Sequence, residues 1–224
     1  MKKRKWINLL SAVLGIALSL GACSSGNESS PMHEAEKKAY REKGQKLAGQ
    51  AQQSLMGAVK KALQEGGPVH AVDYCNVEAE SILDKESQEA GVQISRIARR
   101  NRNPANALQT RGERKAFEKL ENLAPRFDTS LLRREGSRYV YYQPIPLRMT
   151  TCLKCHGEPE KEVAKPTLSL LAERYPEDQA LHYALGDLRG AWKITFPEDF
   201  HPEEEPSGDH SAGEASFYFW ESGL

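Results

Sequence analysis

Five consecutive residues, Cys152-Leu153-Lys154-Cys155-His156, carry the clearest chemistry in this sequence. Two thiols three positions apart can add to the two vinyl groups on one edge of a haem, while the adjacent imidazole is carried beneath the iron. This C-x-x-C-H spacing is the attachment signature of c-type haem. It predicts one covalently bound haem c, with His156 as the proximal iron ligand.

Three other uses of the two thiols compete with haem. A structural zinc site would need a second pair of Cys or His residues at ligand spacing, and the sequence has no such pair. A thioredoxin-like dithiol would lie between a strand and a helix start, whereas the flanks Met149-Thr150-Thr151 and Gly157-Glu158-Pro159 are typical of loops. A disulfide between the two cysteines is the third alternative. Haem fits best because an export signal begins the chain.

Two of the four cysteines lie outside the motif, and one of these, Cys23, is assigned to lipid below. Cys75 is then left alone on the inward face of a predicted helix. It is a candidate distal iron ligand, and a small buried hydrophobe is the alternative. Met149 is too close to the attachment loop to reach the opposite face of the iron, so His182 competes most directly with Cys75. The remaining candidates are a water molecule and the side chains of His70, Met32 and Met56.

A basic cluster follows the second predicted helix and consists of Arg96, Arg99, Arg100 and Arg102. Guanidinium groups pair bidentately with carboxylates. Arg96 and Arg102 are therefore predicted to bind the haem propionates, whereas Arg99 and Arg100 fit a solvated face. Arg189, at a strand start, is a further candidate for a propionate.

The N-terminus has the pattern of a bacterial export signal. Residues 2–5 are all cationic, residues 7–20 form a short apolar run, and Leu20-Gly21-Ala22-Cys23 resembles a lipobox. We therefore predict a lipoprotein signal peptide over residues 1–22, diacylglyceryl modification of Cys23 and a flexible linker over residues 23–33. Ser24 favours the outer membrane, on the side that faces the periplasm. An ordinary secretory signal is the alternative.

The charge balance argues against nucleic acid as a partner. The full chain has 31 basic and 31 acidic residues. Removal of residues 1–22 takes away four basic residues, which leaves 27 basic against 31 acidic residues and a net charge of minus four. A protein with several membrane spans is also excluded, because only the N-terminal segment is apolar over more than ten residues.

Hydrophobic periodicity predicts helices and a few strands between residues 34 and 197, followed by an acidic tail over residues 198–224 that is expected to be disordered. The expected elements are a long amphipathic helix over 34–64 that ends at Gly66-Gly67, a second helix over 69–84 after Pro68, a strand near 92–97, a turn over 103–106, a third helix over 111–123, a strand over 138–147, a helical turn over 168–173 and a strand over 190–196.

The chain resembles the exported, PAS-like single-haem c-type domain that occurs in a photosystem-associated cyanobacterial cytochrome and in sensory regions of bacterial histidine kinases and chemoreceptors. The resemblance spans residues 40–196. The matching stretches are Ala71 to Cys75, Arg96 with Arg102-Asn103-Pro104-Ala105-Asn106, Tyr142-Gln143-Pro144-Ile145, Cys152-Leu153-Lys154-Cys155-His156-Gly157 and Gly186-Asp187-Leu188-Arg189-Gly190-Ala191.

This resemblance implies an α+β fold in which long N-terminal helices cover a PAS-like antiparallel sheet. It also implies His and Cys as axial ligands, and Cys75 matches the ligand cysteine by its place in the second helix. The family usually has a small residue at the position of His182, which weakens that alternative. The lipobox and the acidic, aromatic tail depart from the family pattern.

Two protein ligands would leave no open coordination site on the iron, so the sequence does not favour an enzyme. It favours a lipid-anchored carrier of electrons, or a redox-active binding module, with an unidentified redox partner. The alternative is a redox or gas sensor that signals through a partner protein, because no output domain is present in the sequence.

Overall fold

The computed structural model describes residues 34–123 and 126–203, which all fall within one compact unit, Met32–Leu224. The predicted signal peptide, the linker with Cys23, and the tail from residue 204 onward lie outside the described residues. The elements are α1 (Glu34–Ala90), β1 (Gln93–Ile97), a short 3-10 helix (Pro104–Asn106), α2 (Arg111–Glu121), β2 (Leu131–Glu135), β3 (Arg138–Pro146), α3 (Thr150–His156), α4 (Lys165–Arg174) and β4 (Leu188–Thr195).

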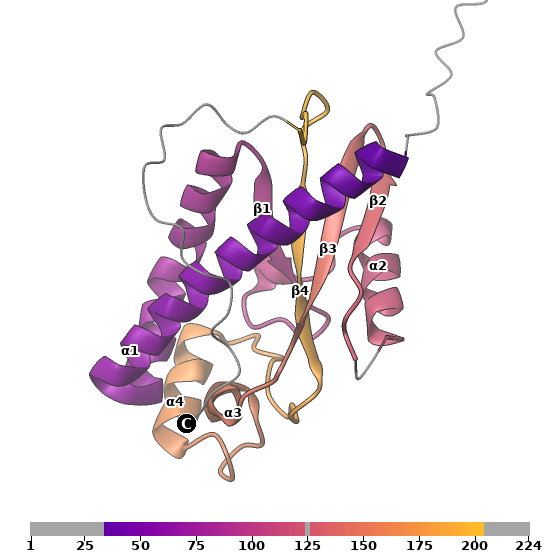
Figure 1. The fold of residues 1–224 in the computed structure, drawn as a ribbon. Helices are drawn as coiled ribbons and strands as arrows, with labels where there is room; N and C mark the ends of the chain where they lie inside the picture. The colour runs from indigo at the N-terminus through magenta and orange to yellow at the C-terminus, as the bar shows by residue number, and fades with distance from the viewer. Residues whose placement is uncertain (1–33, 124–125, 204–224) are drawn as a thin grey trace, which may run out of the picture. The chain divides into compact units, whose positions relative to one another are not determined.

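The long element α1 consists of two helical halves that fold back on each other (Figure 1). Gly66 and Gly67 have non-helical backbone angles, and Gly67 has a φ of 70°, a left-handed conformation that glycine adopts without a steric penalty. Pro68 then starts the second half, where its missing N–H costs no hydrogen bond. The break predicted at Gly66-Gly67 is confirmed, but the second half continues to Ala90 instead of ending at Asp84.

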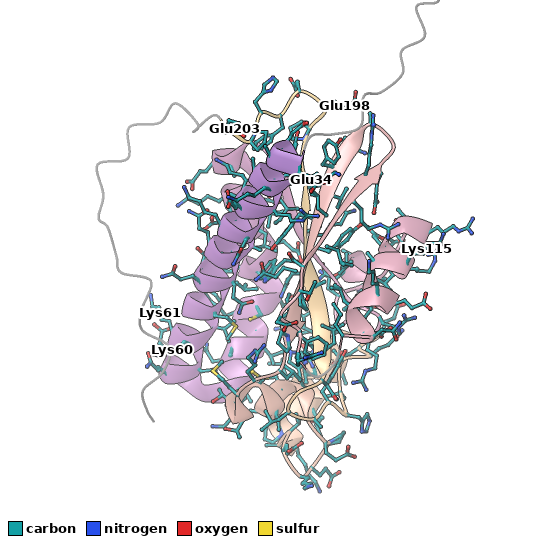
Figure 2. All side chains as sticks on the ribbon, turned by 45° about the vertical axis from the view of Figure 1, so that its right-hand side comes forward. Glu34, Lys60, Lys61, Lys115, Glu198 and Glu203 are labelled. Atoms are coloured by element: carbon teal, nitrogen blue, oxygen red, sulfur yellow. The ribbon has the colours of Figure 1, made fainter. Side chains whose placement is uncertain are left out.

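The four strands form one antiparallel sheet in the order β1-β4-β3-β2. Side chains alternate between its faces, as expected for a strand. Trp192 and Ile194 point toward α1, while Ala191 points toward α2. Figure 2 shows α1 on one side of the sheet and α2, marked by Lys115, on the other. The alternation predicted for residues 190–196 is therefore confirmed.

Two apolar clusters fix these layers. On the α1 side, Tyr141 and Trp192 of the sheet pack against Leu47, Ala48 and Ala51. On the α2 side, Phe117 and Leu120 pack against strands β1 to β4. Each fully buried large side chain of this kind contributes roughly 1.5–3 kcal/mol, so the sheet is held firmly from both faces.

Helices α3 and α4 lie together at the end of the sheet where β3 ends and β4 begins (Figure 1). Leu147 and the residues before β4 exchange backbone hydrogen bonds across this end. Val72 of α1 packs against Leu171 of α4 and Val163. The second half of α1 is thereby joined to the α3–α4 end of the sheet.

The α+β class, the N-terminal helices and the antiparallel sheet agree with the expectation from sequence. The helical turn predicted over 168–173 is confirmed as part of the longer helix α4. Two details were wrong: the Thr150–Thr151 flank is helical and belongs to α3, and β2 was not predicted. None of the described helices is long and apolar enough to cross a membrane.

Candidate haem site

Helix α3 places the three residues of the motif on one side of a short helix. Cys152, Cys155 and His156 stand at positions i, i+3 and i+4, which lie on the same helical face. The helix ends at Gly157, whose N–H donates to the Leu153 carbonyl at 2.9 Å. The local fold thus presents two thiols and one imidazole in the same direction.

The imidazole of His156 is held by one backbone carbonyl. Its Nδ1 lies 2.9 Å from the Ala180 oxygen, and because a carbonyl can only accept, Nδ1 carries the proton and donates. The lone pair of Nε2 accepts a long hydrogen bond of 3.5 Å from the Nε–H of Arg189. Burial lowers the pKa of His156 well below its usual value, and the charges of Arg189 and Arg102 lower it further. The ring is therefore neutral, and a metal bound at Nε2 would replace the hydrogen bond from Arg189.

Cys75 lies on the second half of α1 and is half-buried. Burial raises the pKa of its thiol, while the charges of Arg96 and Arg102 oppose this rise. The pKa of Cys155 is raised by burial, and its charge interacts with that of Cys75. The two thiols, from distant parts of the chain, thus share one electrostatic environment. Among the described residues, Cys75, Cys152 and Cys155 all stay out of disulfides.

Arg96 has a buried donor without an acceptor. Its Nε has no hydrogen-bond partner among the described residues, and its Nη2 lies 3.9 Å from a carboxylate oxygen of Glu80. Burial lowers the pKa of Arg96. Buried donors are nearly always paired, so this guanidinium fits an anionic group that the protein itself does not supply.

The guanidinium of Arg102, unlike that of Arg96, makes several hydrogen bonds within the protein. Its Nε donates to Asp178 at 3.0 Å, and its Nη2 donates to the Cys155 carbonyl at 2.6 Å. Arg189 is the third arginine of the site, and burial lowers its pKa to about 10. The structure brings Arg96, Arg102 and Arg189 close enough to His156 for all three charges to affect it.

A comparison of the sequence with family models and a comparison of the structure with solved structures both point to Tll0287-like proteins. Residues 31–197 match the family model described as Tll0287-like. The chain belongs to the Tll0287-like family. A solved structure, described as the crystal structure of the cyanobacterial heme-protein Tll0287, matches with 23% identity and a TM-score of 0.55. The match covers 75% of this chain and 98% of that one. No curated protein sequence matches.

The shared structure confirms that this Tll0287-like chain has the PAS-like α+β fold expected from its sequence. The structure also separates the residues that sequence reasoning grouped together. Arg99 is bound to Glu121 through two contacts of 2.7 and 2.9 Å, and the guanidinium of Arg100 stacks 3.5 Å from the Tyr183 ring centroid. Arg99 is exposed and engaged away from His156, as expected for a solvated face. Arg100 lies nearer the site, because the Tyr183 ring that it stacks on lies edge-on to the His156 ring, with the ring centroids 6.2 Å apart.

His182 points away from the site. Its side chain is 61% exposed, and its Nδ1 lies 2.9 Å from Glu158. The backbone N–H of His182 donates to the Gly157 carbonyl, directly after the motif. His182 therefore lies beside the C-terminal end of α3, near His156, so its geometry does not favour it as a ligand on the opposite side of the iron. His70 is also partly exposed and lies near Glu65.

The alternative of a zinc site gains no support within residues 34–123 and 126–203. No group of three or more His, Cys, Asp or Glu side chains there is arranged to hold a metal ion. Two thiols, one neutral imidazole with an unprotonated Nε2 and a partly buried arginine with an unpaired Nε instead match the chemistry of haem. The thiols suit its vinyl groups, the imidazole suits its iron, and the arginine suits its propionates.

Sequence reasoning missed the residues that support this arrangement. The Ala180 carbonyl accepts from His156 Nδ1, and the Tyr183 N–H donates to the His156 carbonyl. The Asp178 carboxylate accepts from the Ala180 N–H. A carbonyl such as that of Ala180 leaves no trace in the residue type. Asp178 is one of many acidic residues, so nothing in its sequence context marked it.

Proposed function

We propose that this chain is a lipid-anchored, periplasm-facing c-type cytochrome with a single haem, and that it carries electrons. The observation that carries the proposal is the presentation of Cys152, Cys155 and His156 on one face of α3, with the His156 Nδ1 proton donated to the Ala180 carbonyl and the Nε2 lone pair in contact with Arg189 at 3.5 Å. The name of the similar solved structure, a heme-protein, supports the haem in this proposal.

The residues take distinct roles in this proposal. Cys152 and Cys155 would hold the haem through thioether bonds, and His156 and Cys75 would bind its iron. Arg96 would bind a propionate through its unpaired Nε. Arg102 would bind through Nη1, because its Nε and Nη2 already donate to Asp178 and Cys155. When bound, haem supplies a one-electron couple between ferric and ferrous iron.

The protein's own groups then adapt this couple to electron transfer. A thiolate ligand stabilises the ferric state and lowers the reduction potential. With His156 and Cys75 both bound, the iron would have no open coordination site, so the proposed activity is electron transfer and not an enzymatic reaction. Burial raises the pKa of the Cys75 thiol, and the charges of Arg96 and Arg102 oppose part of this rise, because a cation stabilises a thiolate.

Covalent attachment is tested by haem staining after denaturing electrophoresis. The wild-type protein should give a stained band that survives acid-acetone extraction, and Cys152→Ala/Cys155→Ala should lose it. Lys154→Ala is a matched control, because Lys154 is in the same motif but has no proposed contact with haem. A wild-type band that disappears on extraction would contradict thioether bonds.

Carbon monoxide separates electron transfer from gas sensing. If both axial ligands stay bound, the absorption spectrum of the reduced protein should be the same with and without CO. A CO complex that forms readily would show that the distal ligand leaves on reduction, and would favour a sensor.

The lipid anchor is tested separately through Cys23. Cys23→Ala, or treatment with globomycin, should alter processing and release the protein from membranes. Unchanged processing and an unchanged membrane fraction in both experiments would remove this part of the proposal.

A further inference from the structure

Beside His156 lies an ion pair that is almost entirely removed from water. The side chains of Arg102 and Asp178 are 13% and 7% exposed, and the Nε of Arg102 lies 3.0 Å from Asp178 Oδ2. Burial of two charges is costly unless further hydrogen bonds complete both groups. The remaining contacts of this pair therefore show what the pair holds in place.

Both members of the pair reach the backbone on either side of the His156 ring. Asp178 Oδ1 accepts from the Ala180 N–H at 2.7 Å, and the Ala180 carbonyl accepts from His156 Nδ1 at 2.9 Å. Arg102 Nη2 donates to the Cys155 carbonyl, in the peptide directly before His156, at 2.6 Å. The pair thus fixes the peptide that carries the ring and the peptide that receives its proton.

We propose that Arg102 and Asp178 form a positioning device that holds the His156 Nδ1 hydrogen bond and thereby lowers the reduction potential of the site. The proposal rests on the function proposed above. An Nδ1–H that donates to a well-placed carbonyl makes the imidazole a stronger ligand, because partners of this kind raise ligand basicity. A stronger donor stabilises ferric iron. Arg102 then acts on the iron through Ala180 and Cys155, in addition to any contact with a propionate.

Because Arg102 and Asp178 have opposite charges, the reduction potentials of their variants can distinguish a charge effect from a loss of His156 positioning. Loss of the Arg102 cation should by charge alone lower the potential, and loss of the Asp178 anion should raise it. Loss of the Nδ1 hydrogen bond should raise the potential in both variants. Arg102→Gln and Asp178→Asn in the haem-loaded protein should therefore both raise it. The expected change is about tenfold in the ferrous-to-ferric ratio at a fixed electrode potential, or about 59 mV for a one-electron couple.

A conservative variant tests the geometry of Arg102. Arg102→Lys keeps the positive charge but lacks the planar fork that reaches Asp178 and the Cys155 carbonyl together. The potential should rise in this variant too, although no charge is lost. A potential equal to that of the wild type would mean that only the charge of Arg102 matters, and would overturn the proposal.

The pair formed by Arg99 and Glu121 is a matched control. It has two contacts of 2.7 and 2.9 Å, but its side chains are 51% and 36% exposed and contact neither Cys155 nor Ala180. Arg99→Gln and Glu121→Gln remove the same charges from a site that does not position His156. They should shift the potential only slightly and in opposite directions.

A second measurement follows the hydrogen bond itself. In the reduced, low-spin protein, NMR reports how fast the His156 Nδ1 proton exchanges with solvent. We expect at least tenfold faster exchange in Arg102→Gln and Asp178→Asn than in the wild type. Unchanged exchange, together with potentials that move in opposite directions, would reduce the pair to a charge effect and overturn the proposal.

The experiment remains decisive if a single variant does not fold. The double variant Arg102→Gln/Asp178→Asn leaves no unpaired buried charge, and it should still show the raised potential and the faster exchange. A double variant with wild-type values of both would overturn the proposal. A wild-type protein without covalent haem would instead refute the proposed function, so the two failures are distinguishable.

Discussion

Helices α2 and α3 are both short and both lie next to the same sheet, but different groups hold them. Helix α2 starts with a reciprocal cap, in which Thr110 Oγ1 accepts from the Glu113 N–H and the Glu113 carboxylate accepts from the Thr110 N–H. Helix α3 has seven residues, and Met149 at its start provides no side-chain cap. It is held instead by contacts of Cys155 and His156 with Arg102, Ala180 and Tyr183.

This difference separates a scaffold helix from a site helix. The sequence next to α2 is sufficient to start it, and Phe117 and Leu120 attach it to the sheet. The orientation of α3 depends on its own residues and on residues that lie 24 or more positions away in the sequence. Changes in α2 should therefore alter stability and leave the spectrum intact, whereas changes around α3 should alter the spectrum first.

The largest effect should come from Cys75, which contributes to the site of α3 from another helix. If Cys75 is the distal ligand, the wild-type ferric protein is six-coordinate and low-spin. Cys75→Ser should give a high-spin or water-ligated ferric haem with a raised potential, because the donating anion is lost. Absorption and electron paramagnetic resonance spectra measure this change. His182→Ala is the control and should keep the wild-type spectrum, since His182 is exposed. The reverse result would make His182 the ligand.

Two glycines sharpen the comparison between the helices. A Cβ at Gly157, after α3, would lie 2.7 Å from the backbone oxygen of Leu153, whereas a Cβ at Gly112, in α2, would meet only the end of the Glu135 side chain at 2.8 Å. Backbone cannot move aside as a flexible side chain can. Gly157→Ala should cost about 1–3 kcal/mol of unfolding free energy and lower the yield of haem-loaded protein. Gly112→Ala should cost less and leave the haem yield unchanged. Chemical denaturation measures the unfolding free energy of each variant, and the haem-to-protein ratio measures its haem yield. Equal losses in the two variants would contradict the proposed difference between α2 and α3.

The caps provide a smaller test. Thr110→Ala removes the side-chain cap of α2 and should cost about 1 kcal/mol of unfolding free energy, without a change in the haem spectrum. Thr150→Ala, at the first position of α3, removes a hydroxyl that makes no capping bond and should change stability by less than about 0.5 kcal/mol. Denaturant titrations of both variants measure the difference. A larger loss from Thr150→Ala would show that α3 also has a local start signal.

The smallest effect concerns the pH dependence of stability near α2. Burial raises the pKa of Glu113, but hydrogen bonds from Lys193 and from the N–H groups of Thr110 and Gln109 outweigh burial and set it below its usual value. A lowered pKa in the folded state stabilises the protein above the unfolded pKa of about 4.3, and this contribution is lost as the pH falls through the folded value. Glu113→Gln should therefore flatten the decline of stability below about pH 4.3. Unfolding free energies across acid pH test this, and an unchanged slope would contradict it.

Most of the scaffold could be predicted because its signals are local. The Gly66-Gly67 break, the strand predicted over 190–196 and the helix predicted over 111–123 each follow from residue type and spacing over a few positions, and the structure has all three within two residues of those bounds. Strand β2 was missed because its sequence, Leu131-Leu132-Arg133-Arg134-Glu135, does not alternate between apolar and polar residues. Its pairing with β3 determines that it is a strand.

The sequence alone determined the residues of the site motif, because the spacing of Cys152, Cys155 and His156 is a covalent property of the chain. Only the tertiary structure decided what surrounds them. It places Cys75 in the environment of Cys155, leaves the Nε of Arg96 unpaired, and gives the proton of His156 to a backbone carbonyl. These outcomes depend on contacts between segments far apart in the chain and on the need to pair each buried polar group. The types of the residues in the sequence reveal neither the long-range contacts nor the pairing of buried polar groups.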